Sequence, residues 1–135
     1  MAKKIIMLFI CIWITTFAFS DENYDITNIS QNPEATFRLF PTRNMWTFLQ
    51  LNTITGHIKQ LHFDTSGDSR LKLIVNDENL AKNLPNLKGR FTLYPTQNMY
   101  NFILLDQDNG RTWQVQWSFE EENRMILPIE LFANF

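Results

Sequence analysis

The chain has 135 residues, with 12 Lys or Arg, 14 Asp or Glu and one cysteine, so its formal net charge is −2. This length allows one compact domain and excludes a multidomain enzyme. A single cysteine excludes a disulfide scaffold, and a composition of 14% aromatic and only 19% charged residues excludes a highly charged disordered chain.

The first twenty residues have the layout of a secretory signal peptide. Lys3 and Lys4 give a positive start, residues 5–19 form an almost unbroken apolar run, and Ala18 and Ser20 are small residues suited to cleavage. A membrane anchor is the alternative, but this run is shorter than the roughly 20 residues that a spanning helix needs. We therefore predict cleavage near Ser20, a periplasmic or extracellular location, and no membrane span after cleavage.

Cleavage would change the balance of charges and remove the only thiol. Without residues 1–20 the chain has 10 basic and 14 acidic residues, a formal charge of −4, and no cysteine. Thiol catalysis and cysteine-ligated metals are then excluded. Net acidity without a basic cluster excludes nucleic acid as a partner, because nucleic-acid binding depends on neutralised phosphates.

After a polar N-terminal arm at residues 21–36, the chain contains the same segment twice. Residues 37–63 and 91–117 align without a gap at an offset of 54, and 10 of the 27 positions are identical. Such self-similarity is the signature of a duplicated structural unit. We therefore predict a single β domain over residues 37–135, built of repeat one (37–75) and repeat two (91–129).

Each repeat predicts a β-meander. Short apolar strands are expected at the start and the end of each repeat, and residues 46–51 and 100–105 have the aromatic and aliphatic composition of strands. The return strand of repeat two, residues 112–119, alternates apolar and polar side chains, which indicates one buried and one wet face. Gly56 and Gly110 would supply the positive φ that the connecting turns require.

The pattern as a whole predicts an all-β, mainly antiparallel fold in which a pseudo-twofold axis relates the two repeats. A sandwich and a half-open barrel both fit this pattern, whereas two blades are too few to close a propeller, which usually has about 4–8. Between the repeats, residues 77–87 predict one short helix, capped by Asn76 or Asp77 and ended by Pro85. In the C-terminal tail, Leu131, Phe132 and Phe135 are expected to pack against the domain.

Repeat two carries a distinctive string, Pro95-Thr-Gln-Asn-Met-Tyr-Asn-Phe-Ile-Leu-Leu-Asp106, followed by Gly110-Arg-Thr-Trp-Gln-Val-Gln-Trp117. This string resembles one in small exported two-repeat proteins of Bacteroidetes-type bacteria, for which no activity is established. The resemblance covers both repeats, roughly half of the chain. It implies a bacterial protein exported to the cell envelope and adds no catalytic residue.

The sequence offers little for catalysis or metal binding. The turn at 106–110 begins like a calcium loop, but an EF-hand needs Gly at position six and Glu at position twelve, where this chain has Arg111 and Trp117. His57 and His62 are five residues apart on a predicted strand and would point to opposite faces. We therefore expect no catalytic residue, no cofactor and no metal, and we interpret the chain as non-enzymatic.

The repeated Asn-Met-aromatic corner supplies the candidate ligand-binding residues, which are Asn44 and Trp46 in repeat one and Asn98 and Tyr100 in repeat two. Aromatic faces can stack on sugars or peptide side chains, while an Asn amide fixes their orientation. An architectural role is the alternative, because Asn suits turns and aromatic residues pack across sheets. Trp113 is a further candidate, either in the core or at an interface.

Two functions fit these observations. The first is a protein-binding module of the bacterial cell envelope, of an inhibitor or immunity type, whose partner is another envelope or secreted protein. The second is a carbohydrate-binding module with two equivalent aromatic sites. We favour the first.

Overall fold

The structure is a computed structural model that describes residue 32 and residues 34–132. It confirms the all-β prediction, with two four-stranded antiparallel sheets and almost no helix. The predicted signal peptide and most of the N-terminal arm lie outside the described residues. The elements are β1 (Phe37–Pro41), β2 (Thr47–Asn52), β3 (Ile58–His62), β4 (Leu71–Asn76), β5 (Phe91–Pro95), β6 (Asn101–Asp106), β7 (Thr112–Gln116), the 3-10 helix η2 (Glu121–Asn123) and β8 (Met125–Ile129).

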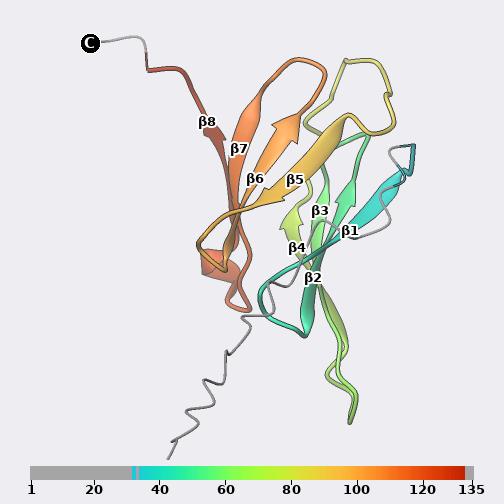
Figure 1. The fold of residues 1–135 in the computed structure, drawn as a ribbon, viewed down its shortest axis with the longest axis vertical. Coiled ribbons are helices and arrows are strands. Elements are labelled where there is room, and N and C mark those ends of the chain that lie inside the picture. Colours follow the sequence, from blue (N-terminus) through green and yellow to red (C-terminus); the bar gives the residue numbers. More distant parts are fainter. Residues whose placement is uncertain (1–31, 33, 133–135) are drawn as a thin grey trace, which may run out of the picture.

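Each sheet is a meander in which neighbouring strands follow one another in the sequence (Figure 1). Sheet 1 contains β1 to β4 and sheet 2 contains β5 to β8. The first two strands of each repeat keep the same register, because Phe37 lies opposite Asn52 and Phe91 lies opposite Asp106. The two sheets do not close into a barrel. They pack on one another as the two layers of a sandwich.

The predicted turns form at the expected glycines. The amide of Gly56 donates to the carbonyl of Asn52 at 2.9 Å, and the amide of Gly110 donates to the carbonyl of Asp106 at 2.8 Å. Both glycines have φ of 79°, a conformation that residues with a Cβ adopt at a cost. The prediction of positive φ at these two positions is therefore confirmed.

One hydrophobic cluster lies between the sheets and includes residues from both repeats. Along β2 the buried positions alternate with partly exposed ones, and the same alternation occurs along β6 and β7. Each sheet therefore has an inner face in the core and an outer face in water. The cluster consists of Phe40, Leu49, Leu51, Ile58, Val75, Ala81, Phe91, Leu93, Phe102, Leu104, Trp113, Val115 and Trp117.

The pseudo-twofold relation between the repeats is wrong, because the two sheets bury opposite faces. Phe91 and Leu93 in β5 are 0% and 3% exposed, whereas Phe37 and Leu39, their equivalents in β1, are 59% and 48% exposed. A twofold axis would bury the same positions in both sheets. The inner face of sheet 1 instead packs on the face of sheet 2 that corresponds to the outer face of sheet 1.

The other strands show the same reversal of buried and exposed faces between the two sheets. Leu49 and Leu51 are fully buried in sheet 1, and their equivalents Ile103 and Leu105 lie on the partly exposed outer face of sheet 2. In the return strands, Phe63 is 40% exposed, whereas its equivalent Trp117 is 1% exposed. The sheets are thus stacked in the same orientation, one behind the other.

Direct contacts between equivalent positions agree with this stacking. The guanidinium of Arg38 donates to the hydroxyl of Thr92 at 3.4 Å, and that of Arg43 donates to the carbonyl of Gln97 at 2.8 Å. In both pairs the partners are 54 residues apart, which is the offset between the repeats. One repeat therefore follows the other along the stack at a similar position and orientation.

The helix predicted at residues 77–87 is replaced by successive turns. The amides of Lys82 and Leu84 each bond to the carbonyl three residues earlier, and Asn83 has a positive φ of 65°. Asn79 accepts a hydrogen bond from the amide of Ala81, so its side chain closes a turn. A helix this short has little stability of its own, and local side-chain hydrogen bonds compete with it.

The C-terminal tail also differs from its prediction. Leu131 is 93% exposed and Phe132 is 80% exposed, so neither packs against the domain. Phe135 lies outside the described residues. Both residues follow β8, an edge strand whose own Leu127 and Ile129 are each 50% exposed. Apolar side chains thus continue along this edge of sheet 2 into the tail.

Candidate functional site

The repeated Pro-Thr-x-Asn corner is held by hydrogen bonds within itself. The hydroxyl of Thr42 donates to the carbonyl of Thr47 at 2.9 Å and accepts from the amide of Asn44 at 3.1 Å. The side-chain oxygen of Asn44 accepts from the amide of Trp46 at 2.9 Å. The Asn side chain therefore shapes the turn that leads into β2.

Repeat two forms the same corner with the same bonds. Thr96 donates to the carbonyl of Asn101 at 2.9 Å, and the side-chain oxygen of Asn98 accepts from the amide of Tyr100 at 2.9 Å. Repetition of the motif thus preserves a turn in both copies. This geometry favours the architectural interpretation of Asn44 and Asn98.

The two corner aromatics have different surroundings. Trp46 is partly buried, with its ring edge-on to Phe63 at a centroid distance of 5.3 Å. Tyr100 is 46% exposed and lies against Trp117 at 5.1 Å. A cavity of about 400 Å³ opens beside Tyr100 and is also lined by Asn98. The structure therefore brings Asn98 and Tyr100 together in a hollow on repeat two.

Trp113 lies in the core and not at the surface. It is 8% exposed, packs on Phe91 at a ring centroid distance of 6.1 Å, and lies under the guanidinium of Arg111 at 5.1 Å. Its place on the inner face of sheet 2 follows from the alternation in β7. Of its two sequence-based interpretations, the structure favours the core.

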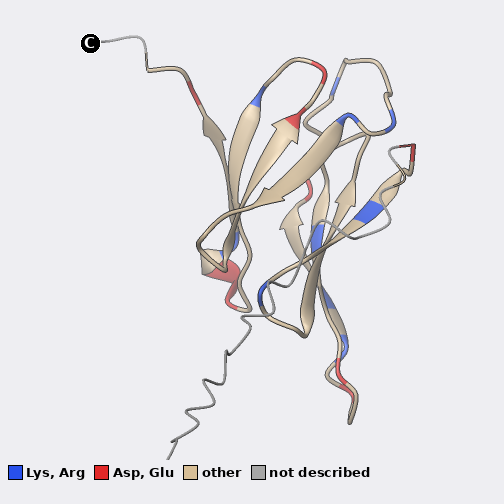
Figure 2. Ribbon diagram, viewed as in Figure 1, with Lys and Arg blue, Asp and Glu red and all other residues tan. Residues whose placement is uncertain are grey.

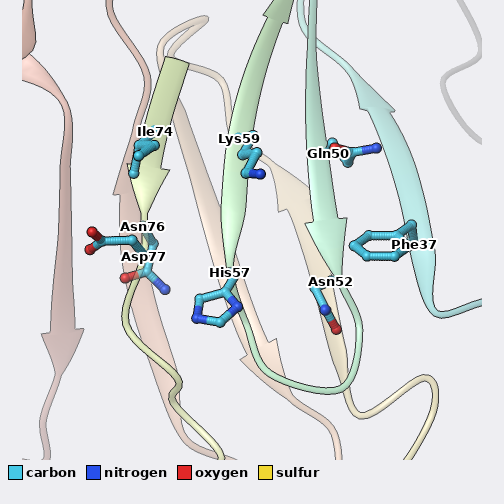
Figure 3. Close-up of a pocket in the computed structure, with 8 residues that line it drawn as sticks. All are labelled: Phe37, Gln50, Asn52, His57, Lys59, Ile74, Asn76 and Asp77. Atoms are coloured by element: carbon cyan, nitrogen blue, oxygen red, sulfur yellow. The ribbon is translucent and has the colours of Figure 1, made fainter. Parts of the chain in front are cut away.

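A second cavity of about 400 Å³ lies on the outer face of sheet 1, where the sequence analysis placed no candidate. Figure 3 labels eight lining side chains and shows Gln50, Lys59 and Ile74 side by side on β2, β3 and β4. Phe37 lies on the edge strand β1, opposite Asn52. Phe37 and Ile74 are 59% and 54% exposed. This surface is open and partly apolar.

The sequence carries only an ambiguous signal for this face. Phe37 and Leu39 alternate with Arg38 and Phe40 along β1, so one pair had to face water. The predicted pseudo-twofold axis implies that equivalent positions in the two repeats share one environment. The structure contradicts this, because Phe91 and Leu93 are buried whereas Phe37 and Leu39 are exposed.

The two repeats carry net charges of opposite sign. Residues 37–75 contain five basic and two acidic side chains, a net charge of +3, and residues 91–129 contain two basic and five acidic side chains, a net charge of −3. Figure 2 shows acidic residues gathered at η2 and basic residues along sheet 1. Lys59 lines the cavity on sheet 1, and Lys72 bonds to Gln50 beside it at 3.4 Å.

A buried ion-pair cluster fastens the connector between the repeats to the turn at 106–110. Asp106 pairs with Arg90 at 3.1 Å and with Arg111 at 3.0 Å, and the side chains of Arg90 and Asp106 are 1% and 0% exposed. Arg111 also donates to the carbonyl of Leu80 at 2.9 Å. These bonds are all internal, so the cluster serves the structure.

The pKa of Asp106 reflects the competition in this cluster. Burial raises the pKa of Asp106, but hydrogen bonds from Arg111, Arg90 and the amide of Asp108 outweigh that effect. The pKa of the carboxyl therefore lies below its ordinary value, and Asp106 is ionised at neutral pH.

Neither a metal cluster nor a membrane span is found in the part of the chain that the structure describes. There, no group of three or more His, Cys, Asp or Glu side chains is placed to hold a metal ion. No helix among the described residues has the length and the apolar character that crossing a bilayer would require.

Comparison with known proteins gives no assignment. No protein family matches the chain, and no curated protein or solved structure matches it. The candidate sites are therefore judged on their own geometry.

Proposed function

We propose that the protein is an exported, non-enzymatic protein-binding module of the bacterial cell envelope and that it receives its partner on the outer face of sheet 1. The observation that carries this proposal is the exposure of apolar side chains across that face. Phe37, Leu39 and Ile74 are each about half exposed or more, at 59%, 48% and 54%. Exposed large apolar side chains gathered on one face mark interaction sites in soluble proteins.

The chemistry of this face indicates what its partner offers. The exposed aromatic and aliphatic side chains lie on the two edge strands, β1 and β4, and favour apolar groups on the partner. Lys59 and Lys72 lie on the same sheet, and the repeat that contains them has a net charge of +3. The fitting partner is therefore a protein surface on which apolar side chains flank carboxylates.

The export part of the proposal depends on the N-terminal sequence. Lys3 and Lys4 precede a 15-residue apolar run, and small residues follow near Ser20. The resemblance of repeat two to exported Bacteroidetes-type proteins supports the same location.

The experiment is a comparison of capture by matched variants. The purified protein is immobilised and exposed to native envelope and culture fractions, and retained proteins are identified by mass spectrometry. Phe37→Glu should abolish retention of the partner. Leu84→Glu, at a 37% exposed leucine outside both sheets, is the control and should retain it. Equal retention by both variants would refute docking on sheet 1.

A second function has its own observation, the cavity beside Tyr100. Its lining combines an exposed aromatic ring with Asn98, Asn101, Gln116 and Asn123, a set of groups suited to a sugar. Only repeat two shows the aromatic in this exposed position, so a single glycan site is proposed in place of two equivalent ones.

A glycan panel tests this alternative with a natural matched pair. Tyr100→Ala should abolish retention on the sugar that binds, while Trp46→Ala should leave it unchanged because Trp46 packs on Phe63. Circular dichroism of both variants checks that the fold is retained. If the panel shows no binding by the unaltered protein, the glycan function is rejected.

A further inference from the structure

The contact between the two repeats can be repeated by a second copy of the chain. The inner face of sheet 1 packs on the inner face of sheet 2, but these faces contain different positions of the repeat. Each repeat thus has a face that fits the opposite face of another repeat. In one chain this fit is used once, and the outer face of sheet 1 and the outer face of sheet 2 are left without a partner repeat.

The outer face of sheet 2 keeps much of the apolar character of the face it corresponds to, with Thr112 in place of the buried Ile58 as a polar exception. Its Tyr94, Ile103, Leu105, Leu127 and Ile129 stand where sheet 1 has Phe40, Leu49, Leu51, Leu73 and Val75. In sheet 1 all of these positions except Leu73 are buried, and Leu73 is partly buried. In sheet 2, by contrast, Tyr94 is 51% exposed and Leu127 and Ile129 are each 50% exposed.

The outer face of sheet 1 keeps part of the complementary set. Phe37, Leu39, Leu61 and Phe63 correspond to Phe91, Leu93, Val115 and Trp117, which are at most 3% exposed in sheet 2. Gln50 and Lys59 stand where sheet 2 has Leu104 and Trp113, so this face is more polar than the one it corresponds to. The contact that such a face makes is weaker than the internal one and can be reversible.

We infer that the outer face of sheet 2 of one copy docks on the outer face of sheet 1 of the next, so that the protein self-associates head to tail. This inference rests on the proposed function and names the partner of the same face. The net charges of +3 and −3 on the two repeats favour it, because each contact joins repeats of opposite sign.

The contact is heterologous, so it continues until it closes into a ring or forms a filament. Stacked four-stranded sheets close as a propeller with about 4–8 blades. Since each copy supplies two sheets, a closed ring contains about two to four copies. This range is the expected size of the assembly.

Sedimentation velocity of the purified protein tests the inference over a range of concentrations. The unaltered protein should sediment as an assembly of about two to four copies. Leu39→Glu on sheet 1 and Ile129→Glu on sheet 2 should each weaken association about tenfold or more. Leu84→Glu should leave it unchanged. Circular dichroism and tryptophan fluorescence of each variant establish that it is folded.

Mixing the two face variants gives the sharpest test. The Leu39→Glu copy keeps an intact sheet 2 face and the Ile129→Glu copy keeps an intact sheet 1 face, so the mixture should form a one-to-one complex and nothing larger. A symmetric dimer that uses one face twice would not produce this result.

Three outcomes would overturn the inference. These are a monomer at the highest soluble concentration, an assembly that survives both face variants, and a mixture that stays monomeric. None of them refutes the proposed function, because a foreign protein could still be captured in a manner that Phe37→Glu abolishes. Conversely, self-association with no foreign partner would support the inference and reject an inhibitor or immunity role.

Discussion

Gln60 and Gln114 are the same residue at equivalent positions, and they occupy opposite environments. Gln60 is 0% exposed on the inner face of sheet 1, and neither atom of its amide has a hydrogen-bond partner among the described residues. Gln114 lies on the outer face of sheet 2 and donates to the side chain of Asn101 at 2.9 Å. A buried amide without a partner loses its hydration at a cost of about 1–3 kcal/mol.

Replacement of Gln60 by Leu should therefore stabilise the protein by about 1 kcal/mol, because it removes the unpaired amide and keeps most of the volume. Gln114→Leu is the matched control and should destabilise by about 0.5 kcal/mol through loss of one hydrogen bond. Urea unfolding of both variants at one protein concentration gives the comparison. A less stable Gln60→Leu variant would mean that the amide is satisfied in solution.

Asp106 predicts how stability depends on pH. Its pKa is lowered in the folded protein, because the hydrogen bonds from Arg111 and Arg90 outweigh its burial. A group with a depressed folded pKa stabilises the fold above its unfolded pKa of about 3.9, and this stabilisation is lost as the pH falls through the folded value. The contribution is therefore complete at neutral pH and declines below about pH 4.

Asp106→Asn should lower stability at pH 7 by about 3 kcal/mol, because the buried Arg90 then keeps only Asp108, a half-exposed partner at 3.2 Å. Asn is the natural residue at the equivalent position 52, where its side-chain oxygen accepts from the amides of Ile54 and Thr55. The variant can thus keep the turn. Urea midpoints between pH 7 and pH 3 should fall less steeply for the variant than for the unaltered protein, and parallel curves would contradict the assignment.

Among the elements, the two glycine turns offer a natural comparison. Gly56 and Gly110 share a φ of 79°, so any side chain costs about 1 kcal/mol at either position. A Cβ on Gly56 would lie 2.9 Å from Cδ1 of Leu80, whereas a Cβ on Gly110 would meet nothing within 4 Å. At the two glycines themselves, the turns differ in what packs against them.

Gly110→Ala should therefore destabilise by about 1 kcal/mol and Gly56→Ala by about 2 kcal/mol or more. The excess at Gly56 should disappear when Leu80→Ala is combined with it, which a double-mutant cycle of thermal or urea unfolding measures. Equal effects of the two single variants would show that Leu80 moves aside freely.

The strands and turns were the part of the fold that the sequence could predict. Alternation in β7 and the two Asx-Gly turns are local signals, since they depend only on neighbouring residues. The prediction of a helix at residues 77–87 was wrong, because hydrogen bonds from the backbone to side chains compete with a short helix. The bond from the amide of Ala81 to the side chain of Asn79 is an example. The sequence also showed no sign that Leu80 of this segment packs against the Gly56 turn.

At the scale of the whole molecule, the choice of buried face was beyond local reasoning. Phe37 and Phe91 are identical residues at equivalent positions, yet they are 59% and 0% exposed. Only the stacking of the two sheets distinguishes them. The same holds for the candidate sites. The sequence pointed to Asn98 and Tyr100, which line one cavity, but it did not point to the cavity on the outer face of sheet 1.

The 54-residue offset has a consequence for how such a chain can change over time. A unit whose two faces fit each other can be duplicated in frame. The added unit can then pack between its two neighbours without a new compensating substitution. Only the first and last units must have one face that tolerates water. In the first unit of this chain, Gln50 and Lys59 place polar side chains on that face. Descendants of this gene would therefore differ more readily in the number of units than in the shape of any one unit.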